Sequence, residues 1–191
     1  MILLNLGCGY VLPKEPWINI DQDASRNVSN YRQIDLNKER FLPWETESVD
    51  GIMANHAFEH FDAIILARIL KDCYRMLKVD GVLRVVVPDA SYFRKVYKKD
   101  NKKNARDLFG EPLAHPEYSK FMDWALFLYE DHRQIFTEDS LWCTIVHAGF
   151  NEDRVYRVQP KCIAIPDHYC NKMLAEIDNR PKFSLVIEAY K

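Results

Sequence analysis

The chain has 191 residues, which is enough for one domain with a sizeable hydrophobic core, and we expect a single domain over 1–191. The formal net charge of −2 argues against a protein that binds nucleic acid through a basic surface. We therefore expect no nucleic-acid partner. No apolar run is long enough to cross a membrane, so we expect no membrane partner either.

The five cysteines form no Cys-x-x-Cys pair, and their number is odd. This usage is typical of unpaired thiols in a reducing compartment, which predicts a cytoplasmic location. Cys162, His168 and Cys170 could be considered as zinc ligands, but Pro166 interrupts them and no fourth ligand is near in sequence. We therefore predict no metal site.

The first predicted strand, residues 2–6, ends abruptly at Gly7-Cys8-Gly9. Because glycine has no side chain, such a turn can bring backbone N–H groups against a cofactor. A second strand at 17–21 ends on Asp21, whose carboxylate could accept hydrogen bonds from both hydroxyls of a ribose. The alternative for Asp21 is a simple cap or an exposed charge at the strand end.

Further strands are predicted at 31–36, which carries Asp35, at 49–55 and at 82–87. The apolar residues of 49–55 suit a buried parallel strand, which places Asn55 and His56 at its carboxyl end, where ligands bind in open α/β sheets. Between the last two strands the spacing predicts a helix over 61–77, with Asp62 as N-cap and Gly81 as its stop. Alternating strands and helices indicate an α/β fold with a mostly parallel sheet.

The pattern changes at about 91–136, where we expect a helical lid or insertion. Its second helix, 116–130, has more aromatic residues than one buried stripe needs, so it could cover a site or form a homodimer contact, although core packing explains most of them. Thr137 is expected to cap a third helix that ends at Ala148-Gly149. Strands at 155–158 and 183–190 would follow, the last running antiparallel as a hairpin.

Taken in order, these segments resemble the class I S-adenosylmethionine-dependent methyltransferases, in particular a small bacterial and phage-type subset. The matching motifs cover nearly the whole chain: Leu4-Asn5-Leu6-Gly7-Cys8-Gly9, Ile20-Asp21, Asp35-Leu36, Leu42-Pro43-Trp44, Ser48-Val49-Asp50-Gly51-Ile52, Glu59-His60, Leu77-Lys78-Val79-Asp80-Gly81, Val87-Pro88-Asp89, His132-x-x-x-Phe136, Ala148-Gly149-Phe150 and Phe183-Ser184-Leu185. No single motif is specific, but their order and spacing are. The resemblance implies a Rossmann-like three-layer sandwich with a seven-stranded sheet.

The same resemblance implies S-adenosylmethionine as cofactor, with S-adenosylhomocysteine as product. Gly7, Cys8 and Gly9 would line its methionine end, with Asn5 where the family has an acid. Asp21 would hold the ribose, and Asn55 and His56 would lie beside the methionyl part and the sulfonium. The adenine would contact Asp35 through its amino group and Leu36 through its ring face.

Methyl transfer needs alignment and, for some acceptors, a base, while the cofactor supplies the reactivity. The candidate bases near the carboxyl edge of the sheet are His56, His60, Asp89, Tyr92 and His132. Each of them, taken singly, could equally cap a helix or hold a loop.

We therefore expect methyl transfer to a small-molecule or sugar-like acceptor. Asn5, and Tyr10-Val11 in place of a third glycine, leave open a non-catalytic cofactor-binding or assembly module. A nicotinamide enzyme is disfavoured because Leu12 stands where the last glycine of its fingerprint belongs. Asn55-His56-Ala57-Phe58 only loosely matches the Asn-Pro-Pro-aromatic motif of nucleic-acid methyltransferases.

Overall fold

The computed structural model describes residues 1–99, 131–159, 162, 164–165 and 183–191. Its strands are β1 (Leu3–Leu6), β2 (Trp17–Asp21), β3 (Tyr31–Gln33), β4 (Val49–Asn55), β5 (Leu77–Pro88), β6 (Val155–Val158) and β7 (Ser184–Tyr190). Its helices are η1 (Phe58–His60), α1 (Ala63–Met76), α2 (Ala90–Lys99), α5 (Glu138–His147) and η3 (Glu152–Arg154).

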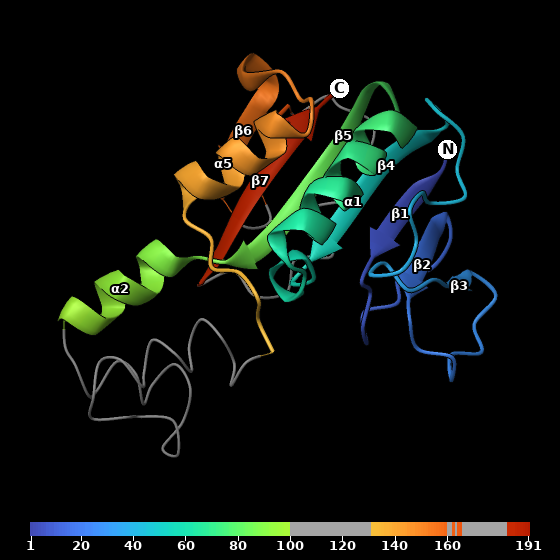
Figure 1. Ribbon diagram of the computed structural model, residues 1–191, viewed down its shortest axis with the longest axis horizontal. Coiled ribbons are helices and arrows are strands. Elements are labelled where there is room, and N and C mark those ends of the chain that lie inside the picture. The colour runs from blue at the N-terminus through green and yellow to red at the C-terminus, as the bar shows by residue number, and fades with distance from the viewer. Residues whose placement is uncertain (100–130, 160–161, 163, 166–182) are drawn as a thin grey trace.

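The strands form one seven-stranded sheet in the order β3-β2-β1-β4-β5-β7-β6. Neighbouring strands from β3 to β5 pair in parallel, whereas β7 runs antiparallel to both β5 and β6 (Figure 1). The α/β class, the seven strands and the antiparallel last strand are therefore confirmed.

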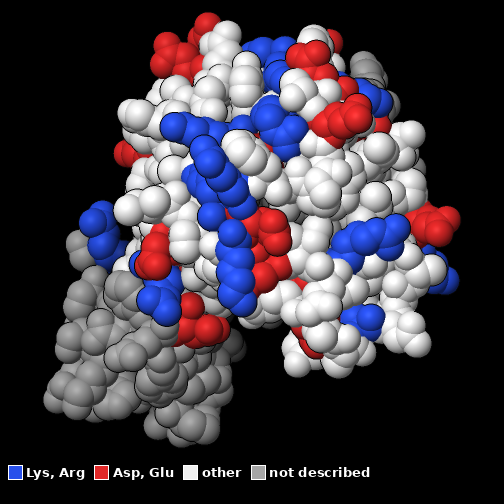
Figure 2. Space-filling view, turned by 45° about the vertical axis from the view of Figure 1, so that its right-hand side comes forward, with Lys and Arg blue, Asp and Glu red and all other residues white. Residues whose placement is uncertain are grey.

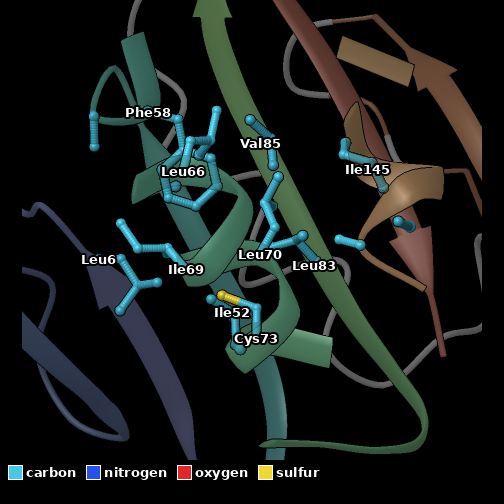
Figure 3. Close-up of a cluster of buried hydrophobic side chains, with 14 of the residues drawn as sticks. Leu6, Ile52, Phe58, Leu66, Ile69, Leu70, Cys73, Leu83, Val85 and Ile145 are labelled. Carbon is cyan, nitrogen blue, oxygen red and sulfur yellow. The ribbon is translucent and has the colours of Figure 1, made fainter. Parts of the chain in front are cut away.

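Helices α1 and α5 lie on one face of this sheet (Figure 1). The side chains of α1 that face the sheet are fully or almost fully buried, as the helical spacing predicts; they include Leu66, Ile69, Leu70 and Cys73. They pack on apolar residues of the central strands, with Ile145 of α5 beside them (Figure 3). This core holds the carboxyl ends of the central strands rigidly in place.

The junction between α1 and β5 differs from the prediction. The helix ends at Met76, and Leu77 is already extended, fully buried and paired with Val49 of β4. Gly81 therefore lies inside β5 and does not stop the helix. Strand pairing overrides the local helix signal here, because a buried Leu77 gains more from the sheet than from another helical turn. Asp62 is the N-cap residue as predicted, although its side chain makes no capping hydrogen bond.

Of two other predicted segments, one agrees with the structure and one ends earlier than predicted. Thr137 caps α5 with a complete capping box through Ser140, which confirms the predicted helix start. The third strand ends at Gln33, so Asp35 and Leu36 follow it in a loop and are not part of it. Most of the expected lid, including the helix 116–130 with its dimer contact, lies outside the described residues. No helix among the described residues is long and apolar enough to span a membrane.

The opposite face of the sheet carries a buried ion pair between β5 and β7. Arg84 of β5 lies directly opposite Glu188 of β7, and their side chains approach to 2.5 Å with no exposed surface. The second oxygen of Glu188 accepts hydrogen bonds from the Tyr190 hydroxyl and the backbone N–H of Ala164. Arg84 also donates to the carbonyl oxygen of Cys162. The pair thus fastens Cys162 and Ala164 to the sheet.

Replacing Glu188 by Leu would leave the Arg84 guanidinium buried without its counter-charge. We expect the free energy of unfolding, measured by urea denaturation, to fall by about 3–5 kcal/mol. The matched double variant Arg84→Met/Glu188→Leu removes both charges and should recover most of this loss. A Glu188→Leu variant as stable as the parent chain would show that the ion pair does not stabilise the sheet.

Candidate functional site

A pocket of about 400 Å³ opens at the carboxyl ends of the parallel strands. Residues from six separate segments line it: Gly7, Gly9, Asp21, Gln22, Ile34, Asp35, Leu36, Asn37, His56, Ala57, His60, Phe61, Asp131 and Arg133. Seven of the predicted site residues are among them: Gly7, Gly9, Asp21, Asp35, Leu36, His56 and His60. Most of the site residues predicted from the sequence thus line one continuous cavity.

The glycine turn after β1 has a backbone that other residues adopt only with strain. Gly7 and Gly9 have φ of 62° and 49°, in the left-handed region. A Cβ atom on Gly7 would lie 2.6 Å from the Cβ of Ala57, whereas one on Gly9 would meet nothing within 4 Å. Gly7 is therefore required for packing, and Gly9 leaves open space beside the pocket.

Asp21 connects this turn to the end of β2. Its Oδ2 accepts a hydrogen bond of 2.8 Å from the backbone N–H of Gly9, and its Oδ1 accepts one of 2.7 Å from Gln22. The carboxylate therefore fixes the glycine turn and also lines the pocket. Asp21 therefore caps the strand end and also faces the pocket, and its role toward a ribose stays a prediction.

Asp35 and Leu36 form the far wall of the pocket, beyond β3. Leu36 is buried in the main core, so it offers the pocket an apolar surface. A hydrogen bond from Lys38 lowers the pKa of the Asp35 carboxyl below its ordinary value, which keeps it ionised at neutral pH. An acid beside an apolar wall suits a flat ring that carries an amino group.

Asn5 is placed beside the pocket but does not line it. Its side-chain amide donates to the carbonyl oxygen of Val11 at 2.9 Å and to the Asn19 side chain at 3.0 Å, and it is almost fully buried. Asn19 and Asn30 in turn both donate to the carbonyl oxygen of Pro13. These three asparagines hold the loop 10–16 against β1 and β2, so Asn5 supports the glycine turn from behind. Its role toward a cofactor stays a prediction.

His56 begins the pocket wall after β4 in a strained backbone conformation, with φ of 50°. Its Nε2 lies 3.0 Å from the Ser184 hydroxyl, and its Nδ1 lies 3.3 Å from Oε1 of Glu59. The ring thus has a hydrogen-bonding partner in β7 at one nitrogen, and its other nitrogen faces the Glu59 carboxylate of η1. Asn55, one residue earlier, does not line the pocket.

Glu59 is the residue around which three predicted histidines gather, although the sequence singled it out only as part of the Glu59-His60 motif. Its carboxylate is buried between His56 and His132, whose Nε2 lies 3.9 Å from Oε1. The His132 ring packs edge-on against His60, with ring centroids 4.7 Å apart. The backbone N–H groups of Arg133 and Gln134 both donate to the Glu59 carbonyl oxygen. These contacts bring a segment more than seventy positions away to the pocket mouth.

The two remaining candidate bases do not line the pocket. Asp89 accepts hydrogen bonds from the backbone N–H groups of Ser91 and Tyr92, so it caps the start of α2. The Tyr92 ring packs against Phe93. Their catalytic roles are predictions that these contacts do not support.

Seven pocket residues went unpredicted: Gln22, Ile34, Asn37, Ala57, Phe61, Asp131 and Arg133. All of them lie within two residues of a predicted site residue, so proximity in sequence was the available signal. Asp131 and Arg133 flank the candidate base His132, and backbone hydrogen bonds from Arg133 and Gln134 to Glu59 hold this segment at η1.

Cys8 lies within the glycine turn but is buried, and burial together with the nearby Asp21 raises the pKa of its thiol to about 12. Burial also raises the pKa of the Cys73 thiol. Since the thiolate is the reactive form, we expect iodoacetamide at pH 8 to label the exposed Cys143 and Cys162 first. Peptide mass spectrometry should find Cys8 and Cys73 labelled only after denaturation. Rapid labelling of Cys8 in the folded chain would contradict its placement.

Comparison with known proteins finds a matching domain model and solved structures with the same fold. Residues 4–85, which include β1, the glycine turn, β2, β4 and α1, match a family model described as a methyltransferase domain. No curated protein matches the chain.

Solved structures share the fold over the whole length. A SAM-dependent methyltransferase from Archaeoglobus fulgidus is 16% identical, with a TM-score of 0.59 over 99% of this chain and 85% of that one. One from Thermotoga maritima is 20% identical, with a TM-score of 0.56 over 100% and 82% of the two chains. One from Mesorhizobium loti is 14% identical, with a TM-score of 0.54 over 100% and 90%. At these identities the likeness shows the fold.

The family match covers the segment that builds the glycine turn, Asp21 and His56, and the sheet order agrees with the shared fold. Membership of a small bacterial and phage-type subset stays a prediction. Residues 4–85 thus match a methyltransferase domain, and the chain has the fold of solved S-adenosylmethionine-dependent methyltransferases.

Proposed function

We propose that this protein transfers the methyl group of S-adenosylmethionine to a small, polar, sugar-like acceptor. One observation carries the proposal: a single pocket joins the glycine turn, Asp21 and Asp35 to the histidines His56 and His60. The glycine turn and the two aspartates suit the cofactor. The two histidines lie where an acceptor could reach the methyl group of the cofactor.

The residues present fit the cofactor. The open space at Gly9 leaves room for a ligand against the backbone, since a Cβ there would meet no protein atom. Asp21 keeps lone pairs beyond its two backbone hydrogen bonds, and these would accept from the ribose hydroxyls. Asp35 and Leu36 would hold the adenine, while Gly7, Cys8 and Gly9 would support the methionine end, with Asn5 and Asn55 behind them.

When bound, the cofactor supplies an electrophilic methyl group on a positively charged sulfur. The contribution of the chain is to hold the acceptor in line with that group and to keep water away. The strained backbone of His56 and the contact of its ring with Ser184 suit a positioning role, because they limit how far the ring can move. The catalytic roles of His56, His60 and His132 remain proposals.

The acceptor end of the pocket is polar and carries both signs of charge. His60, Asp131 and Arg133 line it, and a hydroxyl-rich molecule could hydrogen-bond to all three. The cavity of about 400 Å³ must also contain the cofactor, so the acceptor is small.

The protein surface agrees with a partner other than nucleic acid, since one face shows Lys and Arg side chains interspersed with Asp and Glu (Figure 2). We retain the cytoplasm as the expected location, because the four described cysteines are free thiols.

The cofactor half of the proposal is tested by Asp21→Ala. Loss of the carboxylate removes the ribose acceptor and loosens the Gly9 turn, so we expect affinity for S-adenosylhomocysteine, measured by calorimetry, to fall at least about tenfold. The matched control is Asp23→Ala, which removes a nearby acid that does not line the pocket and should leave affinity unchanged. Equal affinities in all three proteins, or no binding by the parent chain, would refute the proposal. Binding without turnover on sugar-like acceptors would favour a non-catalytic module.

Alanine substitutions at the two glycines separate packing from binding. Gly9→Ala should cost about 1–2 kcal/mol of unfolding free energy for its backbone strain and weaken cofactor binding, because its Cβ would occupy the space beside the pocket. Gly7→Ala carries the same strain. The contact of its new Cβ atom with Ala57 should cost about a further 1–3 kcal/mol of unfolding free energy. Urea denaturation and calorimetry measure the two effects. A Gly9→Ala protein that binds as tightly as the parent would place the cofactor elsewhere.

A further inference from the structure

We propose that Glu59, His60 and His132 form a binding site for a divalent first-row metal ion, of which zinc is the first to test. Each residue offers one ligand atom, and these atoms all lie within 4.8 Å of one another. The expectation of no metal site was based on cysteines and His168, none of which belongs to this group. The two histidines and one carboxylate match the ligand types of known open metal sites.

The carboxylate of Glu59 is the strongest evidence for a ligand here. Glu59 is 1% exposed, and within the described part of the chain neither of its carboxylate oxygens has a hydrogen-bond partner. A buried carboxylate is costly unless it is paired with a positive charge or coordinates a metal. The nearest nitrogen atoms belong to His56 and His132, at 3.3 and 3.9 Å, and both distances leave the oxygens available to an ion.

The two histidines are oriented in the way that metal ligands usually are. Nδ1 of His60 lies 3.0 Å from the backbone carbonyl oxygen of Asp131, and a contact of this kind fixes the ring and leaves its second nitrogen for an ion. His132 is buried, and its ring packs edge-on against that of His60. Backbone hydrogen bonds from Arg133 and Gln134 to Glu59 hold the two ligand segments together.

The distances require a small adjustment. A zinc ion about 2.1 Å from each donor places donor pairs about 3.4 Å apart in a tetrahedral arrangement. The Glu59–His132 contact of 3.9 Å is close to this value, and a pair at the limit of 4.8 Å must shorten by about 1.4 Å. His60, whose side chain is 34% exposed, has room to make that movement.

The site lies beside the pocket, because His60 and its neighbour Phe61 both line the cavity. Three protein ligands leave an open coordination position, to which an acceptor oxygen could bind and become more acidic. In that case His60 and His132 are ligands and not bases. This role toward the acceptor rests on the proposed function, whereas metal binding itself does not. Mg²⁺ is disfavoured, since it prefers oxygen ligands and two of the three donors are nitrogens.

The test is calorimetric titration of chelator-treated protein with Zn²⁺, repeated with Co²⁺ to record its visible spectrum. We expect one site per chain with micromolar or tighter affinity, and no competition from millimolar Mg²⁺. Glu59→Gln, which keeps the shape of the side chain, and His132→Ala should each weaken binding at least about tenfold. Circular dichroism must show that both variants remain folded.

The matched control is His147→Ala. His147 lies exposed on α5, one turn from the exposed Cys143, so this pair could bind zinc adventitiously. The variant should keep the high-affinity site and its Co²⁺ spectrum. No binding of Zn²⁺ or Co²⁺ by the parent chain, or binding that Glu59→Gln leaves unchanged, would overturn the proposal. Cofactor binding is measured separately, so metal binding without S-adenosylhomocysteine binding would refute the proposed function alone.

Discussion

The parallel pairing of β1 with β2 on one side and β4 on the other is the constraint from which the site follows. Leu6 is in register with Ile20 of β2 and with Ala54 of β4. Because all three strands point the same way, the residues that follow them emerge at one edge of the sheet. The glycine turn, Asp21 and His56 therefore meet there although they are far apart in the sequence.

Buried polar groups then hold this edge in shape. The amides of Asn5, Asn19 and Asn30 secure the loop behind the glycine turn, and Asp21 secures the turn itself. These bonds satisfy polar groups that would otherwise be costly to bury. The Glu59 carboxylate is different, because histidines surround it without giving it a hydrogen bond. That contrast separates a group that supports the fold from one available for chemistry.

Most of the fold was predictable, because hydrophobic spacing and glycine positions are local signals. The core stripe of α1, the capping box at Thr137 and the antiparallel last strand all follow from such patterns. The end of α1 was not predictable in this way. Leu77 leaves the helix because its pairing with Val49 is a contact between distant segments, and Gly81 is only a misleading local signal.

The sequence by itself determined the fold class and which strand ends line one side of the pocket, since Gly7, Gly9, Asp21 and Asp35 stand at or near strand ends whose order it reveals. Only the tertiary structure decided which of the five candidate bases share a site. It placed Asp89 as a helix cap and gathered His56, His60 and His132 around Glu59. The physical reason is that these contacts depend on the packing of residues 131–134 against η1, through backbone hydrogen bonds to Glu59. No local pattern of spacing in the sequence encodes that packing.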